Sequence, residues 1–213
     1  MKRPYIVINC AMSADGKIAS PAGKQMRISC EEDIQRMYKL RNESDAVLVG
    51  INTVLSDDPK LTVKEKYVKN PKQPIRIVLD TYCKTPANSL VVNDVSKTLI
   101  ITSQKCSNKY HDNVEIIQCK SKNGLIDLKE FLNICLDKKI NKLMVEGGGK
   151  VIFNFLKSGF VNDIFFYIGP IVIGGENTPS ISGVINNLGN IPLKLINVKK
   201  IGPGILLHYK LIK

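Results

Sequence analysis

Short apolar runs, separated by stretches rich in glycine, proline and charge, recur along the chain as far as Asp163. Runs of this length bounded by turn residues are typical of strands that are buried on both faces of a parallel sheet. An amphipathic helix would instead show apolar residues every three or four positions. The pattern predicts strands over residues 4–11, 46–50, 75–80, 98–102, 114–118 and 142–146.

Three helices are predicted between these strands. Two of them, over residues 29–42 and 127–139, begin with serine or aspartate followed three residues later by glutamate. This spacing is that of a capping box, in which side chains bind the free backbone N–H groups of the first turn. The third helix follows the glycines at 147–149 and ends near Gly159. In the first helix an apolar face is predicted at Ile34, Met37, Tyr38 and Arg41.

The remaining segments complete an α/β arrangement. Residues 12–28 and 56–74 are predicted as loops, and residues 51–57 as a short turn. We expect one domain over residues 1–213, with a mostly parallel central sheet flanked by helices and a C-terminal antiparallel hairpin. The last strands are predicted over residues 164–173, with an interruption at Gly169-Pro170, and over 193–201 and 205–212 around a turn at 202–204.

A chain of 213 residues can bury a sizeable core. No apolar run reaches the roughly 18 residues of a membrane-spanning helix, and the run after Pro4 is too short for a signal peptide. We therefore expect a cytoplasmic protein without a membrane partner. The six cysteines contain no Cys-x-x-Cys pair, and only two histidines are present. These counts favour reduced, packed cysteines and argue against a disulfide framework and against a metal site.

The formal net charge of +12 comes from lysines spread along the whole chain. A field of this sign attracts phosphorylated small molecules or nucleic acid. A basic nucleic-acid-binding module is therefore an alternative function, although no recognised binding motif is present and the basic residues are not concentrated on one element. DNA or RNA binding with a steep salt dependence, and no cofactor binding, would support that alternative.

The segment Val145–Lys150 combines a strand end, three glycines and a helix start. Glycines let the backbone come close to a ligand and adopt positive φ. The helix that follows directs free N–H groups and its positive dipole end at a ligand, for which a dinucleotide pyrophosphate is well suited. A plain tight turn is the alternative. The Rossmann fingerprint and the Walker loop are both absent.

Three other strand ends carry polar side chains. Asp15 follows the first strand, Thr53 and Asp57 follow the second, and Thr81 follows the third. In open α/β sheets, ligands bind at the carboxyl ends of the strands. We therefore expect these groups and the glycine segment to form one cleft, with a helix cap at Thr53 and an ordinary turn at Asp58-Pro59 as the structural alternative.

The ordered set of motifs resembles a known family. The motifs are Met-Ser-x-Asp-Gly-Lys-Ile at 12–18, Val-Gly-x-x-Thr-Val-x-x-Asp-Asp-Pro-x-Leu-Thr at 49–62, Pro-x-Arg-Ile-Val-x-Asp at 74–80 and Glu-Gly-Gly-Gly at 146–149. With the segment 160–175, they resemble the reductase half of bacterial riboflavin-pathway enzymes and, more closely, the free-standing archaeal and fungal 2,5-diamino-6-ribosylamino-4(3H)-pyrimidinone 5′-phosphate reductases. The resemblance implies a dihydrofolate-reductase-like fold, NADPH as cofactor with NADH as a possible substitute, and a homodimer.

The resemblance also implies roles for individual residues. Lys64 stands where bacterial members have arginine, so a point charge would replace a two-pronged phosphate contact. The glycines are implied at the diphosphate, Thr81 near the adenosine 2′-phosphate and Ile126 beside the adenine. The implied cofactor contacts are Ala11, Thr53, Asp57, Thr81, Tyr82, Ile126, Gly147, Gly148, Gly149 and Lys150, and the implied substrate contacts are Gln25, Arg41, Asp57, Leu61, Lys64 and Glu146.

The reaction implied by the resemblance reduces a ribosylamino group to a ribitylamino group. Hydride from the nicotinamide reaches C1′ of a ring-opened sugar, so the protein must hold the two carbons about 3–3.5 Å apart. Asp57 and Glu146 are the catalytic candidates, as carboxylates that orient ribose hydroxyls and assist proton movement. A dihydrofolate reductase, or a reductase of another pterin or pyrimidine, is the alternative with the same fold, although the chain has no tryptophan. The zinc deaminase pattern of the bifunctional enzymes is absent.

Overall fold

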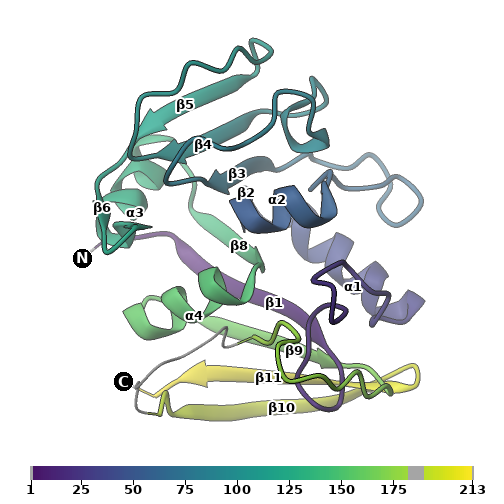
Figure 1. The fold of residues 1–213 in the computed structure, drawn as a ribbon. Coiled ribbons are helices and arrows are strands. Elements are labelled where there is room, and N and C mark those ends of the chain that lie inside the picture. The colour runs from purple at the N-terminus through teal and green to yellow at the C-terminus, as the bar shows by residue number, and fades with distance from the viewer. Residues whose placement is uncertain (1, 182–189, 213) are drawn as a thin grey trace. The chain divides into compact units, whose positions relative to one another are not determined.

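The computed structural model describes residues 2–181 and 190–212. They divide into two compact units. Figure 1 shows the helices and strands of these residues. The first unit contains residues 1–5 and 39–144, and the second contains residues 6–38 and 145–213. The sequence predicted a single domain over residues 1–213, and this stays a prediction.

The first unit contains four parallel strands in the order β2-β3-β4-β5. All residues of β2 and β4 are buried, as expected for apolar runs covered on both faces of a sheet. The prediction of these four strands is confirmed to within one residue. Their bounds are Ala46–Gly50 for β2, Ile75–Leu79 for β3, Thr98–Thr102 for β4 and Val114–Gln118 for β5.

Two helices of the first unit follow directly from the sequence around them. Helix α3 (Leu128–Asp137) begins where predicted, because the Asp127 side chain accepts from the backbone N–H groups of Lys129 and Glu130. Helix α2 (Ile51–Asp57) replaces the turn predicted at 51–57, and that prediction is wrong. The seven residues after β2 contain no glycine or proline, so nothing interrupts a helix before Asp58, which adopts a left-handed conformation.

The rest of the first unit is short elements and loops. The 3₁₀ turn η1 (Leu90–Val92) and the hairpin β6 (Ser121–Lys122) and β7 (Leu125–Ile126) were not predicted. Residues 58–74 contain no regular element, as predicted. The fully buried Arg76 of β3 donates to the carbonyls of Leu90, Asn93 and Ser96, and so fixes the loop that follows η1.

Helix α1 (Glu31–Asn42) begins two residues later than predicted, ends where predicted and has a different buried face. Tyr38 is buried as predicted, whereas Ile34 and Met37 are half-buried. The most buried residue of the helix is Asp33, with 2% of its surface exposed. Ser29 Oγ donates to one Asp33 oxygen at 2.6 Å and Arg36 Nε to the other at 2.8 Å, which offsets the cost of burying the carboxylate.

The second unit contains the strand order β10-β11-β9-β1. Strands β1 (Tyr5–Met12) and β9 (Asp163–Ile168) are parallel, and β11 (Gly204–Leu211) is antiparallel to β9. Strand β10 (Leu193–Ile201) completes the predicted C-terminal hairpin, drawn in yellow in Figure 1. The boundary between the units falls within β8 (Lys142–Gly147), which leads to helix α4 (Gly149–Ser158).

The strand predicted over residues 164–173 is too long at its C-terminal end, because β9 ends at Ile168. Gly169 donates its N–H to the Met12 carbonyl and lies against Ile28. A Cβ atom at this position would be 2.6 Å from the Ile28 carbonyl oxygen, so only glycine fits. Pro170 then prevents further ladder bonding through its own nitrogen.

Cys83 and Cys106 form a disulfide, so the prediction that all six cysteines are reduced is wrong for this pair. The spacing of the two residues does not indicate it, because the contact depends on two neighbouring strands ending together. Cys10, Cys119 and Cys135 are buried free cysteines, and burial raises the pKa of each thiol to about 12.

Membrane-spanning helices and clusters of metal ligands are absent from the described part of the chain. No helix within residues 2–181 and 190–212 is long and apolar enough to cross a membrane. Over the same ranges, no group of three His, Cys, Asp or Glu side chains is placed to hold a metal ion.

Candidate cofactor and substrate sites

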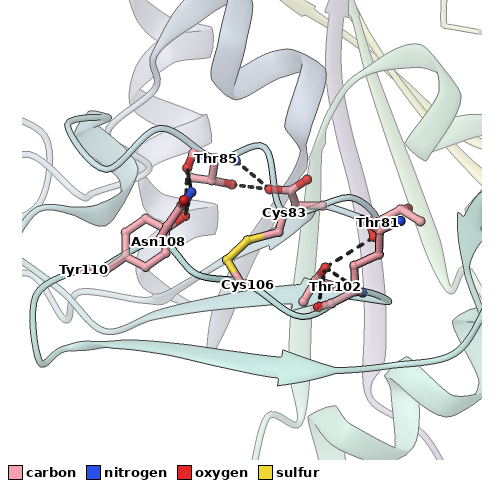
Figure 2. The surroundings of a disulfide bond; sticks show 9 residues. Thr81, Cys83, Thr85, Thr102, Cys106, Asn108 and Tyr110 are labelled. Carbon is pink, nitrogen blue, oxygen red and sulfur yellow. Dashed lines mark hydrogen bonds between the residues drawn. A yellow bond between two sulfur atoms is a disulfide. The ribbon is translucent and has the colours of Figure 1, made fainter.

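The carboxyl ends of β3 and β4 hold Thr81 in place. The Thr81 carbonyl accepts from Thr102 Oγ1 at 3.3 Å, and from the backbone N–H and the hydroxyl of Ser103 at 3.1 and 2.9 Å (Figure 2). Only 9% of Thr81 is exposed. The residue predicted to lie near the adenosine 2′-phosphate is therefore fixed at adjoining ends of two parallel strands, where ligands of α/β sheets bind.

Tyr82 reaches the turn of the β6–β7 hairpin. A Cβ atom at Gly124 would lie 3.0 Å from Tyr82 Oη, and Lys84 Nζ is 5.7 Å from the centre of the Tyr82 ring. Ile126, two residues beyond Gly124, is buried. The structure thus brings Thr81, Tyr82 and the hairpin that carries Ile126 together in the first unit, as the prediction of an adenosine site requires.

Thr53 and Asp57 lie on helix α2, not in a turn. Residues four apart are neighbours on one face of a helix, so the two side chains share a face, while the buried Val54 lies on another. Both residues are half-buried. The helical repeat fixes Thr53 and Asp57 as neighbours, which a turn would not do.

Arg41, Leu61 and Lys64 lie around one loop of the first unit. Arg41 Nη1 donates to the Thr62 carbonyl at 2.9 Å, which ties the end of α1 to this loop. Leu61 is 2% exposed and has a positive φ of 52°. The Gln73 side chain accepts from the Val63 N–H and donates to the Val63 carbonyl. Lys64 is exposed. The three predicted substrate residues are therefore close together, and Arg41 also holds the loop.

In the second unit, β8 leads through Glu146 and Gly147 into helix α4, with Gly148 as the N-cap. Gly148 has φ 78°, which non-glycine residues rarely adopt, and it supplies no side-chain acceptor. The N–H groups of the first turn are therefore not capped by a side chain. Lys150, in this first turn, is exposed. This agrees with the predicted anion-binding helix start.

Glu146 lies close enough to Cys10 of β1 for its charge to affect the thiol. Burial is the main cause of the raised pKa of Cys10, and the negative charges of Glu146 and then Asp33 raise it further. The side chain of Ala11 packs against the cluster of Tyr167, Ile201 and Leu206. A ligand at Ala11 would therefore contact its backbone, as the resemblance implied. Gln25 lies exposed in the loop before α1.

The Met-Ser-x-Asp-Gly motif has a clear structural role. Ser13 Oγ donates to Asp15 Oδ1 at 2.5 Å, and Asp15 accepts from the backbone N–H groups of Ile173 and Gly174. These bonds, led by that from Ser13, lower the pKa of Asp15 to about 2. The motif therefore fastens two loops of the second unit, a role that the sequence analysis did not assign.

A second polar group that the sequence analysis missed joins α1 to β1. Arg36 Nη2 donates to Asn9 Oδ1 at 2.6 Å, its Nε binds Asp33, and its guanidinium lies 5.8 Å from the centre of the Phe165 ring. An aspartate and an arginine three apart in a helix were the only sequence signal.

The elements of the two units and their order define an α/β protein of the dihydrofolate-reductase-like class. Residues 4–207 match the RibD C-terminal domain, and the chain belongs to this family. It is 40% identical over 188 residues to the 2,5-diamino-6-ribosylamino-4(3H)-pyrimidinone 5′-phosphate reductase of Archaeoglobus fulgidus, which covers 84% of this chain and 86% of that protein.

Other relatives differ in length. The reductase of the same name from Methanothermobacter thermautotrophicus is 33% identical over 214 residues, covering 97% of this chain and 98% of that protein. The riboflavin biosynthesis protein RibD of Actinobacillus pleuropneumoniae is 35% identical over 220 residues, which are 99% of this chain but 58% of that protein. The chain thus spans little more than half of this RibD protein and nearly the full length of the Methanothermobacter reductase.

Solved structures agree on the fold. A deaminase/reductase from Thermotoga maritima superposes with a TM-score of 0.84 at 25% identity, covering 99% of this chain and 57% of that one. The riboflavin biosynthesis reductase of Saccharomyces superposes with a TM-score of 0.79 at 22% identity, covering 99% and 90%. At such identity the second likeness concerns the fold alone.

Proposed function

We propose that this chain reduces the ribosylamino side chain of 2,5-diamino-6-ribosylamino-4(3H)-pyrimidinone 5′-phosphate to the ribitylamino form, with NADPH as reductant, in riboflavin biosynthesis. The observation that carries the proposal is its similarity to free-standing reductases named for this substrate, which it matches over 86% and 98% of their length. The net charge of +12 suits two polyanionic ligands.

We assign residues of each unit to parts of a dinucleotide cofactor. When bound, the nicotinamide supplies the hydride, which is chemistry that the protein itself lacks. We assign the diphosphate to the backbone of Gly147–Gly149 and to Lys150, because the helix start there has a glycine N-cap. Thr81, Tyr82 and Ile126 would bind the adenosine end, supported by the contact of Tyr82 with the β6–β7 turn. Ala11, Thr53 and Asp57 complete the proposed set.

The substrate would be held by charge and by hydrogen bonds. Arg41 and Lys64 carry positive charge beside one loop and suit the ribose phosphate, with Leu61 in the same loop and Gln25 as further contacts. We assign the reacting sugar to Asp57 and Glu146. A carboxylate at each position would orient the ribose hydroxyls and accept or return a proton as the ring opens.

The direct test is oxidation of NADPH, followed by its absorbance, with the diamino substrate, its deaminated counterpart and dihydrofolate in parallel. We expect turnover with the diamino substrate and none with dihydrofolate. Turnover of dihydrofolate alone would favour the alternative reductase, and no turnover of any pyrimidine or pterin would overturn the proposal. If the deaminated compound is not reduced, reduction precedes deamination. If it is reduced as well, either order of the two reactions is open to the enzyme.

We infer that NADPH is preferred over NADH, because the resemblance puts Thr81 near the adenosine 2′-phosphate, and Lys84 adds a positive charge beside Tyr82 in the same loop. A larger rise in melting temperature with NADPH than with NADH at equal concentration would support this preference. An equal rise would contradict it.

We also propose that the protein is a cytoplasmic homodimer and binds neither nucleic acid nor membrane. The dimer is supported by strand β10, which exposes Leu195, Ile196 and Val198 along the end of the second unit's strand order. The cytoplasm is supported by the need for NADPH and a phosphorylated metabolite. DNA binding that persists at physiological salt would contradict the assignment.

A further inference from the structure

The Cys83–Cys106 disulfide joins the loops that follow two neighbouring parallel strands. Cys83 lies in the loop after β3 and Cys106 in the loop after β4, 23 residues further along the chain. Their Cα atoms are 5.6 Å apart, and Figure 2 shows the bond between the two loops. It therefore lies on the same side of the first unit as the proposed adenosine site.

Hydrogen bonds already hold both ends of the first loop. At one end the Thr81 carbonyl accepts from Ser103, and at the other Asp80 Oδ2 accepts from the N–H and the hydroxyl of Thr85, each at 2.7 Å. The Thr85 carbonyl also accepts from Asn108 and Tyr110 of the second loop (Figure 2). The disulfide adds a covalent link from Cys83, which lies between these two ends and next to Tyr82, to the second loop.

Cys83 has a left-handed backbone, with φ 52°. This conformation is unfavourable for a residue with a Cβ atom and persists where surrounding contacts enforce it. The Cys83 N–H donates to the Asp80 carbonyl at 3.1 Å, and the disulfide is the second constraint. Without the disulfide Cys83 can return to negative φ, which would displace its neighbours Tyr82 and Lys84.

We propose that Cys83 and Cys106 are a redox-dependent positioning pair for the adenosine end of the cofactor. This inference rests on the proposed NADPH-dependent function. In the disulfide form the loop presents Thr81, Tyr82 and Lys84 together, and in the dithiol form Tyr82 and Lys84 are released while Thr81 stays bound to the β4 end. Disulfides in reducing compartments are usually transient and redox-sensing, which agrees with such a role.

The step itself is a thiol–disulfide exchange with a low-molecular-weight disulfide such as glutathione disulfide. One cysteine thiolate attacks the reagent, forms a mixed disulfide and displaces one thiol. The second cysteine thiolate then attacks the first cysteine sulfur and displaces the other thiol. The cysteine pair loses two electrons and two protons, and the reagent gains both as two thiols. Both cysteines are half-buried, whereas Cys10, Cys119 and Cys135 are buried.

The experiment compares full-length protein equilibrated with glutathione disulfide and protein reduced with dithiothreitol. Alkylation and mass measurement count the free thiols, and equilibrium binding gives the Kd for NADPH and for NADH. We expect reduction to release two thiols, to raise the Kd for NADPH about tenfold and to raise the Kd for NADH by clearly less, because both cofactors lose the Tyr82 contact but only NADPH has a 2′-phosphate for Lys84. General loosening of the fold would weaken both cofactors alike.

Two variants complete the test. The double variant Cys83→Ser/Cys106→Ser should bind NADPH like the reduced wild type in either buffer, whereas Cys30→Ser, which removes the half-buried free thiol, should keep the wild-type response. Equal NADPH affinity in both redox states, or no loss of thiols on oxidation, would overturn the inference and leave the proposed function intact. Absence of NADPH binding in both states would instead contradict the proposed function. The wild-type comparison needs no variant to fold.

Discussion

Asp57 places a carboxylate at the C-terminal end of α2, on the helix face that also carries Thr53. We predict that Asp57→Asn lowers kcat about tenfold or more, because the amide cannot accept a proton during ring opening. Steady-state kinetics with NADPH and the diamino substrate measures this.

Asp58→Asn is the matched control for Asp57. The Asp58 carboxylate accepts from the Leu90 N–H at 2.7 Å, and the amide oxygen of asparagine can still do so. Asp58→Asn removes one negative charge, as Asp57→Asn does, but it should leave kcat near the wild-type value. Wild-type kinetics for Asp57→Asn, or an equal loss in both variants, would remove Asp57 from the catalytic set.

Asp15 predicts a pH dependence of stability. Its folded-state pKa is about 2, and the unfolded-state pKa of an aspartate is about 4. Because the folded-state pKa is lowered, the charged carboxylate stabilises the fold above about pH 4, and this contribution is lost as the pH falls toward about 2. The melting temperature of Asp15→Asn should be below that of the wild type at pH 6, and the difference should shrink between about pH 4 and 2. A constant difference would contradict the prediction.

Polar residues at strand ends could be located from sequence, because a buried apolar run fixes where each strand stops. This placed Thr81 correctly at the end of β3. Asp33 could not be predicted as buried, since its burial depends on Arg36 and Ser29, which reach it only in the folded protein. The pairing of Cys83 with Cys106 was missed for the same reason.

At the scale of elements, the junction of β8 and α4 depends on Gly148. Any residue with a Cβ atom at this position would have to keep the backbone at φ 78°, at a cost of about 1–3 kcal/mol. If the backbone relaxed to a more favourable φ instead, the N–H groups of the first turn of α4 would move. We predict that Gly148→Ala raises the Kd for NADPH about tenfold or more, measured by equilibrium binding.

Gly159→Ala is the control for this helix. Gly159 is the C-cap of α4 with φ 73°, and nothing lies within 4 Å of the position that a Cβ would take. The substitution also strains the backbone at the other end of the same helix, but less than at Gly148, because Gly159 is in the left-handed region and Gly148, with ψ 123°, is not. It should lower the melting temperature less than Gly148→Ala does, without changing NADPH affinity. Equal NADPH affinity for Gly148→Ala and the wild type would show that this helix start does not bind the cofactor.

Element prediction was most successful where one local signal was sufficient. Continuous apolar runs gave β2 and β4 with their observed bounds, and Asp127 gave the start of α3. It failed where a contact with a distant segment decides the outcome. Strand β9 stops at Ile168 because Gly169 packs on Ile28, which lies far away in the sequence. The apolar residues after Pro170 carry no sign of that contact.

For the whole molecule, strand β10 is the feature that bears on assembly. It pairs with β11 on one side and lies at the end of the strand order of the described residues. Its apolar side chains are well exposed, with 49% of Leu195, 44% of Ile196 and 52% of Val198 accessible to solvent. Soluble monomers rarely leave an edge strand in this state, because it invites pairing with another chain.

We predict a dimer with twice the 23.7 kDa mass of the chain, and conversion to monomers by the double substitution Ile196→Lys/Val198→Lys. Lysines on an edge strand stay solvated and repel their counterparts on a second copy, so the interface loses both apolar area and charge compatibility. Sedimentation or light scattering measures the mass. Val172→Lys is the matched control, since Val172 is 76% exposed in a loop of the same unit and should leave the dimer intact. A monomeric wild type, or a double variant that still dimerises with unchanged affinity, would exclude β10 as the interface.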